Sequence, residues 1–252
     1  MKDTNVLARC NLFAVLGAIP HLLRLDPIAA ALVRGKFIKV GFSVKNGPKA
    51  TLIIRDGEAE LVKGTEDCDI KLWFPSADKF NNMIDGKGTP IPVSGFRHIG
   101  FLLKDFTNLT DRLSAYLRPD PEKLKDPVFF ECSTTLMLYV IGRAIVQIGN
   151  HDQVGMFSAS NIVDGKIKLG IGEGLAVAIH CKDNHLLFNA DPTEAGVTSR
   201  MVFDSLTTAR DLFDGRINAI AAVGMGKVRI SGMVSQVDNI NRILDRVAVY
   251  LA

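Results

Sequence analysis

The stretch Ser205–Met233, SLTTARDLFDGRINAIAAVGMGKVRISGM, carries the clearest fold signal in this chain of 252 residues. Ser205 can cap a helix, apolar side chains then recur at helical spacing, and Gly215 can close the helix. The segment Lys227–Gly232 changes to the alternation of a β-strand. No His stands beside a Ser or Cys here and no metal-ligand spacing occurs, so the stretch predicts a binding unit and not a reaction centre.

The same pattern occurs in the first half of the chain. Three segments of the first half align with three of the second at offsets of 127, 129 and 134, and the offsets drift in one direction along the chain. Such a drift predicts two copies of one unit with small loop insertions. The aligned pairs are NGPKATLIIRDGE with EGLAVAIHCKDNH, WFPSADKFNNMIDGK (Trp73–Lys87) with VFDSLTTARDLFDGR (Val202–Arg216), and DRLSAYL (Asp111–Leu117) with DRVAVYL (Asp245–Leu251).

The boundary between the copies falls in Arg118–Pro127, RPDPEKLKDP, which has three prolines and alternating charge. This composition is typical of an exposed connector. The sequence therefore predicts two domains, residues 1–121 and 122–252.

Each half also shows the same order of predicted elements. In the first half, alternating segments on either side of Asn46-Gly47 and Asp56-Gly57 predict a β meander, because these dipeptides favour tight hairpins. A helix after Ser76, a further strand and a terminal helix over Thr107–Leu117 follow. Each half begins with a long apolar helical stretch. The sequence predicts an α+β fold in which helices cover one face of an antiparallel sheet.

Composition narrows the class of protein. Hydrophobic residues make up 47% and charged residues 23%, which is close to the globular average, and a net charge of +3 is too small for a nucleic-acid footprint. Charged residues and Pro20 interrupt the apolar N-terminal run, so we expect neither a signal peptide nor a membrane span there, and a cytoplasmic location. We expect four reduced, buried cysteines, because no CxxC pair occurs: Cys10, Cys68, Cys132 and Cys181.

The order of these motifs resembles the sterol carrier protein type 2 family. The best match is GKVRISG (Gly226–Gly232) with LFDGR (Leu212–Arg216) before it, and ATLIIRDG and MIDGK match in the first half. The resemblance covers nearly all of both halves and implies two tandem domains. Each would be a five-stranded, antiparallel-leaning sheet with helices on one face, around an apolar tunnel for lipids, with the terminal helix often acting as a lid.

Two positions depart from the family pattern. Met233 stands where family members commonly carry an acidic or amide residue, and SGFRHIGFLL (Ser94–Leu103) replaces the GK strand of the first copy. The first copy is therefore expected to have an altered pocket.

Phe, Met and Leu side chains on the helices can leave an elongated gap against the sheet, and Met adapts well to flexible ligands. The residues expected to line this gap, which could also be simply core, are Phe80, Met83, Ile84, Phe96, Phe101 and Leu102 in the first half and Phe203, Leu212, Phe213, Met225, Ile230 and Met233 in the second.

The sequence predicts no catalytic residue, metal ligand or cofactor. GIGEG (Gly170–Gly174) and GMGK (Gly224–Lys227) lack the spacing of a phosphate-binding loop and are better explained as hairpin glycines. His180 and His185 are expected to be surface or structural residues, and the other three histidines have no partner that spacing can assign, so we expect that the chain is not an enzyme. The histidines are His21, His98, His151, His180 and His185.

A run of basic residues begins at Arg34 and continues with Lys36 and Lys39. It is either a solvated strand face or a contact for an anionic membrane or the phosphate of acyl-CoA.

Two functions from different classes remain. The first is a non-catalytic, cytoplasmic carrier of an apolar lipid of fatty acyl, acyl-CoA or isoprenoid type, in an internal cavity. The alternative is an accessory module with solid cores that supports an enzyme complex. The chain could be a monomer of two pseudo-symmetric domains or a homodimer.

Overall fold

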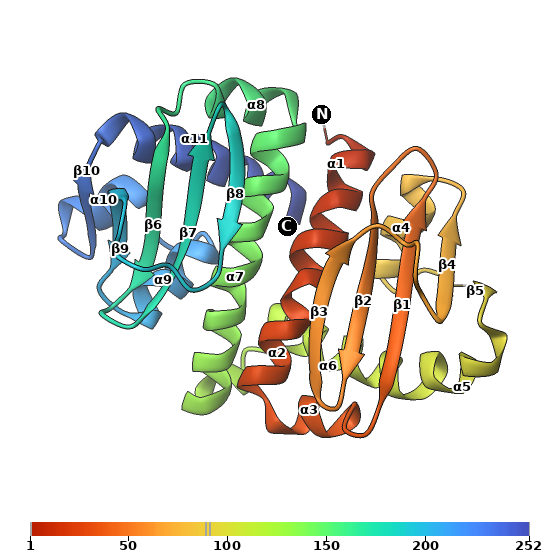
Figure 1. The fold of residues 1–252 in the computed structure, drawn as a ribbon. Helices are drawn as coiled ribbons and strands as arrows, with labels where there is room; N and C mark the ends of the chain where they lie inside the picture. The colour runs from red at the N-terminus through yellow and green to blue at the C-terminus, as the bar shows by residue number, and fades with distance from the viewer. Residues whose placement is uncertain (1, 89, 91, 252) are drawn as a thin grey trace. The chain divides into compact units, whose positions relative to one another are not determined.

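The computed structural model describes residues 2–88, 90 and 92–251. The chain divides into two compact units, Met1–Cys132 and Ser133–Ala252 (Figure 1). Each unit has its own five-stranded sheet with helices packed on it, which confirms the predicted α+β fold class.

Unit 1 begins with a nearly continuous helical stretch and then alternates strands with short helices. Its helices are α1 (Thr4–Arg9), η1 (Cys10–Val15), η2 (Leu16–Ala18), α2 (Ile19–Leu25), α3 (Pro27–Leu32), α4 (Ala77–Ile84), η3 (Phe96–His98), α5 (Ile99–Phe101), η4 (Leu102–Phe106), α6 (Thr107–Leu117) and η5 (Lys123–Lys125). Its strands are β1 (Phe37–Val44), β2 (Lys49–Arg55), β3 (Glu58–Lys63), β4 (Ile70–Phe74) and β5 (Pro92–Ser94).

Unit 2 begins within the long helix α7 (Pro127–His151), whose first six residues belong to unit 1. Its further helices are α8 (Gln153–Ala159), α9 (Leu206–Phe213), α10 (Ala219–Gly224) and α11 (Val234–Leu251). Its strands are β6 (Gly165–Ile171), β7 (Leu175–Lys182), β8 (His185–Asn189), β9 (Val197–Phe203) and β10 (Val228–Gly232).

The two sheets have the same strand order and the same pairing directions. The order is β3-β2-β1-β4-β5 in unit 1 and, read in the same sense, β8-β7-β6-β9-β10 in unit 2. Neighbours pair antiparallel except β1 with β4 and β6 with β9, which are parallel. The parallel pair arises because the fourth strand crosses back to lie beside the first one, a long-range step that local patterns did not predict.

Hairpin turns occur where the dipeptides predict them. Asp56 and Gly57, between β2 and β3, both have positive φ, and so do Asp183 and Asn184 between β7 and β8. Two successive residues with positive φ are the signature of the tight turn that matches the twist of a hairpin.

One face of each sheet is apolar and buried. In β1 the inward residues Ile38, Val40, Phe42 and Val44 are buried, and the ring of Phe42 contacts that of Phe80 on α4 at a centroid distance of 6.5 Å. In β6 the corresponding buried set is Ile167, Leu169 and Ile171. Successive strand residues point to opposite faces, so these sets lie on the face that the helices cover.

Two helical stretches are long and apolar enough to span a bilayer by length and composition. They are Thr4–Leu25 and Pro127–His151, and 72% and 56% of their most apolar windows are buried within the protein. Core helices meet the same criterion. The N-terminal stretch is therefore more apolar than the charge interruptions in the sequence suggested.

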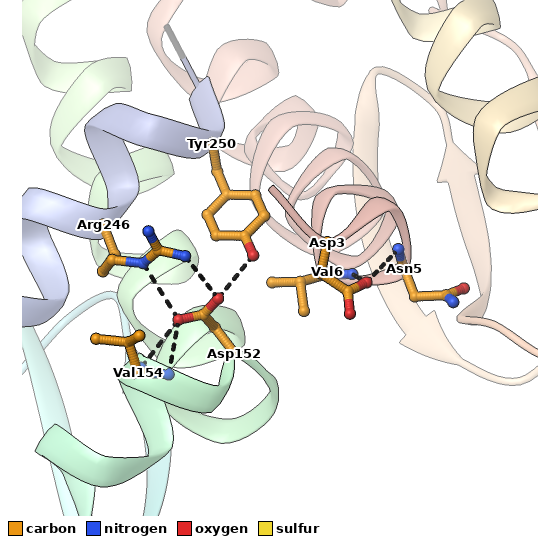
Figure 2. A network of polar contacts seen from close by, with 8 residues as sticks. Asp3, Asn5, Val6, Asp152, Val154, Arg246 and Tyr250 are labelled. Carbon is orange, nitrogen blue, oxygen red and sulfur yellow. Dashed lines mark hydrogen bonds and ion pairs between the residues drawn. The ribbon is translucent and has the colours of Figure 1, made fainter. Parts of the chain in front are cut away.

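A buried carboxylate joins α8 to the terminal helix α11 in unit 2. Asp152 caps α8 by accepting hydrogen bonds from the backbone of Val154 and Gly155 at 3.1 and 3.0 Å. Arg246 on α11 donates to both carboxylate oxygens at 3.2 and 2.9 Å, and the Tyr250 hydroxyl donates at 2.7 Å (Figure 2). The Asp152 side chain is only 6% exposed, and each of its two oxygens accepts at least two hydrogen bonds from the protein.

Unit 1 repeats the capped aspartate and its arginine partner. Asp26 caps α3 through the backbone of Ile28 at 3.0 Å, and Arg112 on α6 pairs with both its oxygens. The guanidinium of Arg112 lies 5.7 Å from the centroid of the Tyr116 ring, as that of Arg246 lies 5.5 Å from Tyr250. We refer to these two clusters as the carboxylate locks.

The locks shift the titration of both aspartates. Burial alone raises the pKa of Asp152, but the hydrogen bonds from Arg246, Tyr250 and Gly155 outweigh it and hold that pKa below its usual value. For Asp26 the pKa is likewise lowered, because Arg112 and the Ile28 amide outweigh burial.

We expect Asp152→Asn to lower the free energy of unfolding by about 3–5 kcal/mol, because it leaves the Arg246 cation without its buried partner. Asp238→Asn is the matched control, since Asp238 forms an exposed pair with Arg242 one turn away and contributes at most about 0.5 kcal/mol. Urea unfolding of the variants measures both values. Similar small losses would show that the lock does not hold α11.

The lowered pKa values predict a loss of stability in acid. The folded-state pKa of each lock aspartate lies below the unfolded value of about 3.9, so the stabilisation is complete above that pH. It disappears as the pH falls through the folded-state pKa. The difference in unfolding free energy between the native chain and Asp152→Asn should therefore shrink below about pH 4. A difference that stays constant down to about pH 2 would contradict the assignment.

Candidate functional site: the apolar edge of each unit

The predicted lining residues of unit 1 range from the core to the surface. Phe80 is fully buried on α4, and its ring packs edge-on against Phe74 at 5.1 Å. Leu102 is buried as well, whereas Met83, Ile84 and Phe101 are half-buried. Phe96 is 61% exposed. A chain of ring contacts, Phe101–Phe106–Phe42–Phe80, links the surface to the core at centroid distances of 6.4, 6.0 and 6.5 Å.

Unit 2 shows the same gradient. Phe203 on β9 is buried and contacts the half-buried ring of Phe213 on α9 at 5.7 Å. Leu212 is also half-buried. Met225, Ile230 and Met233 are exposed around the edge strand β10. In both units the predicted set thus runs from buried through half-buried to exposed side chains, and we call such a graded set an apolar path.

The exposed ends of these paths occupy corresponding places in the two units. We name residues 92–104 the first edge segment and residues 223–234 the second edge segment. Each includes the outermost strand of its sheet, β5 or β10, and leads toward the terminal helix. The large apolar side chains exposed on them are Val93, Phe96, Ile99 and Leu103 in the first and Val223, Met225, Ile230, Met233 and Val234 in the second.

A Ser-Gly pair ends the outer strand in both units. Gly95 and Gly232 have φ of +81° and +87°. A Cβ at Gly95 would overlap the carbonyl oxygen of Asp69, and a Cβ at Gly232 would overlap that of Thr198, each on the segment alongside. In unit 1 the short outer strand β5 ends at Ser94, and the rest of SGFRHIGFLL is mostly helical, so the strand lies just before the segment that the sequence analysis singled out. The repeated Ser-Gly was visible in the sequence, but the neighbouring carbonyl was not.

A hollow of about 300 Å³ lies on the other face of the unit 1 sheet. Lys39, Thr51 and Ile53 line it, and these residues alternate with the inward side chains of β1 and β2. On the helix-covered face, aromatic rings contact one another where the sequence predicted a gap.

The basic run has acidic partners. Lys36 forms an ion pair with Asp105 at 2.9 Å and Lys39 pairs with Asp67, whereas Arg34 is exposed. The charges of Lys36 and Lys39 are therefore partly neutralised by acidic neighbours within unit 1.

The cysteines are free, and Cys10, Cys132 and Cys181 are buried while Cys68 is half-buried. Burial raises the pKa of the Cys132 thiol to about 11, so the group is protonated at neutral pH. Among the described residues, no group of three or more His, Cys, Asp or Glu side chains could hold a metal ion.

No protein-family model and no curated protein sequence matches the chain. Solved structures similar to it include a sterol carrier protein 2 from Yarrowia lipolytica in its apo form, at 18% identity and a TM-score of 0.33. That match covers 43% of this chain and 89% of the other. A ubiquinone synthesis protein described as UbiJ-SCP2 (10% identity, TM-score 0.35) and a further sterol carrier protein 2 (15% identity, TM-score 0.35) match 45% and 44% of this chain and 93% and 92% of theirs.

We expect Gly232→Ala to destabilise the protein more than Gly215→Ala. Both glycines have positive φ, +87° and +68°, which costs an alanine about 1–2 kcal/mol. Only at Gly232 would the added methyl group also overlap a backbone carbonyl, because the Cβ position at Gly215 has no neighbour within 4 Å among the described residues. Urea unfolding and hydrogen exchange of β10 measure the difference. Equal costs would contradict the close approach of β10 to β9.

Proposed function

We propose that this protein is a non-catalytic binder of apolar lipids, which enter each unit at its edge segment and insert a chain between the sheet and the helices. The observation that supports this proposal is the apolar path from buried rings, through half-buried side chains, to exposed ones at the outer strand. Graded sets of this kind occur in both units, and their members are the twelve residues that the sequence pattern selected.

The energetics favour a long apolar chain. Each CH₂ group removed from water contributes roughly 0.8 kcal/mol, so a fatty acyl or isoprenoid chain can offset the work of separating the packed rings. Met83 and Leu212 are half-buried on short helices, where flexible side chains can change rotamer to admit a ligand. We propose fatty acyl, acyl-CoA or isoprenoid lipids as the ligand class.

The filled core supports a second candidate. Phe42, Phe74, Phe80 and Phe106 contact one another on the face where a ligand would lie. Solid cores with exposed apolar side chains fit an accessory module that supports an enzyme complex through its surface. In that case the edge segments would contact a protein and no lipid would enter.

Native mass spectrometry of the purified chain, followed by organic extraction and lipid analysis, separates the two candidates. The binder should carry an acyl or isoprenoid species at up to two per chain, one for each unit. A chain that arrives empty and does not take up a fluorescent fatty acid would favour the accessory module.

Substitutions inside the path test the same proposal without identification of the ligand. We expect the double variant Met83→Asn with Leu212→Asn to weaken the binding of a fluorescent fatty acid roughly tenfold. Each substitution places an unsatisfied amide against the acyl chain of the ligand. Leu187→Asn on β8 is the control, since that leucine is 48% exposed and lies outside the path. Equal affinities for all three proteins, with melting temperatures that show them folded, would exclude insertion at this path.

A further inference from the structure

Both edge segments lie in stretches of sequence without a single acidic residue. Between Asp85 and Asp105 the chain has Lys87, Arg97 and Lys104 but no Asp or Glu. Between Asp214 and Asp238 it has three basic residues, Arg216, Lys227 and Arg229, and again no acid. In a chain whose overall net charge is only +3, each edge segment is therefore basic in its own sequence, although Asp69 lies beside the first segment and Asp204 beside the second.

The cations of the edge segments are exposed. Arg97, Lys104, Lys227 and Arg229 make no ion pair within 4 Å among the residues that the structure describes, although Lys227 lies near enough to Asp204 to help lower the pKa of that carboxyl. Arg97 donates a hydrogen bond to the ring of its neighbour His98 at 2.8 Å. By contrast, Lys36 and Lys39 of the basic run already have acidic partners.

Exposed apolar side chains alternate with these cations along the chain. Phe96 precedes Arg97, Leu103 precedes Lys104, and Arg229 precedes Ile230. Phe96, Ile99 and Leu103 follow one another at intervals of three and four residues on a helical path, so they share one outward face. Their exposed fractions, 61%, 44% and 63%, leave a large part of each side chain open to solvent.

We propose that the two edge segments dock the protein on the surface of an anionic lipid bilayer. The apolar side chains would enter the boundary between headgroups and acyl chains, and the adjacent Lys and Arg side chains would reach lipid phosphates. Charge complementarity selects this occupant, because segments that carry exposed cations, no acidic residue of their own and protruding apolar side chains match an anionic, deformable interface. The docking does not depend on a lipid inside either unit, so it goes beyond the function proposed above.

The test is sedimentation of the full chain with vesicles of phosphatidylcholine mixed with phosphatidylglycerol. We expect binding that falls as salt rises and is weak on vesicles of phosphatidylcholine alone. Lys227→Gln with Arg229→Gln should weaken the partition constant by about fivefold for each cation removed. Phe96→Ser with Leu103→Ser should weaken it by about tenfold or more.

Matched controls exist on the same chain. Lys63→Gln with Lys182→Gln removes the same charge from exposed positions on β3 and β7, and Phe157→Ser with Val154→Ser removes equally exposed apolar side chains from α8. Both control pairs should bind vesicles as the native chain does. Losses equal to those of the edge variants would overturn the assignment of docking to the edge segments.

Three other results would also overturn the proposal. They are no binding of the native chain to anionic vesicles, binding that is indifferent to salt and to lipid charge, and a dimer that dissociates in the edge variants, which would make the segments a contact between copies. Fluorescent fatty acid uptake without vesicles is measured in parallel. Uptake without vesicle binding would overturn the docking alone, and vesicle binding without uptake would overturn the lipid-insertion proposal alone.

Discussion

The carboxylate lock is the interaction on which the edge segment of each unit depends. In unit 2 a buried aspartate receives two backbone amides, both ends of an arginine fork and a tyrosine hydroxyl, and unit 1 repeats the capped aspartate and its arginine. A buried carboxylate is costly unless its lone pairs are satisfied, and these partners come from two helices that only the folded unit brings together. The lock therefore fixes the terminal helix against a short helix far away in the sequence.

This fixed helix sets the geometry of the edge segment before it. In unit 2 the second edge segment leads directly into α11, and at its other end β10 is held against β9 by the close approach at Gly232. In unit 1, Gly95 and the lock on α6 do the same for the first edge segment. The exposed apolar side chains thus stand on a segment that is anchored at its strand and at its helix. An anchored segment can keep apolar side chains at the surface, where a free one would collapse onto the nearest core.

The sequence predicted the local features well, because they depend on neighbouring residues. Ser76 and Ser205 cap their helices as expected, and Gly86 and Gly215 follow them with positive φ. The lock could be seen only in part. Arg112, Tyr116, Arg246 and Tyr250 stood out as repeated letters, but their aspartates lie 86 and 94 residues from the arginines, and no local pattern links them.

Burial was equally hard to predict, since apolar residues of one period can face the core or the solvent. Phe80 and Phe96 belonged to the same predicted set, yet one is fully buried and the other is mostly exposed. The parallel pairing of β1 with β4 decides this, because it places α4 over the centre of the sheet and leaves the segment after β5 at its rim. Topology of this kind comes from contacts between distant parts of the chain, which hydrophobic periodicity does not encode.

The filled core and the open edge together constrain how an apolar ligand could be exchanged. A closed cavity would require a lid to open into water, with its apolar walls hydrated during the transfer. Here the rings already contact one another, so an acyl chain that entered would have to displace side chains one after another from the edge inward. The core would close again behind an acyl chain that left. Such stepwise exchange avoids an empty cavity, whose cost in a protein core grows with its volume. A packed interior is therefore compatible with lipid binding when its apolar surface continues to the rim of the sheet.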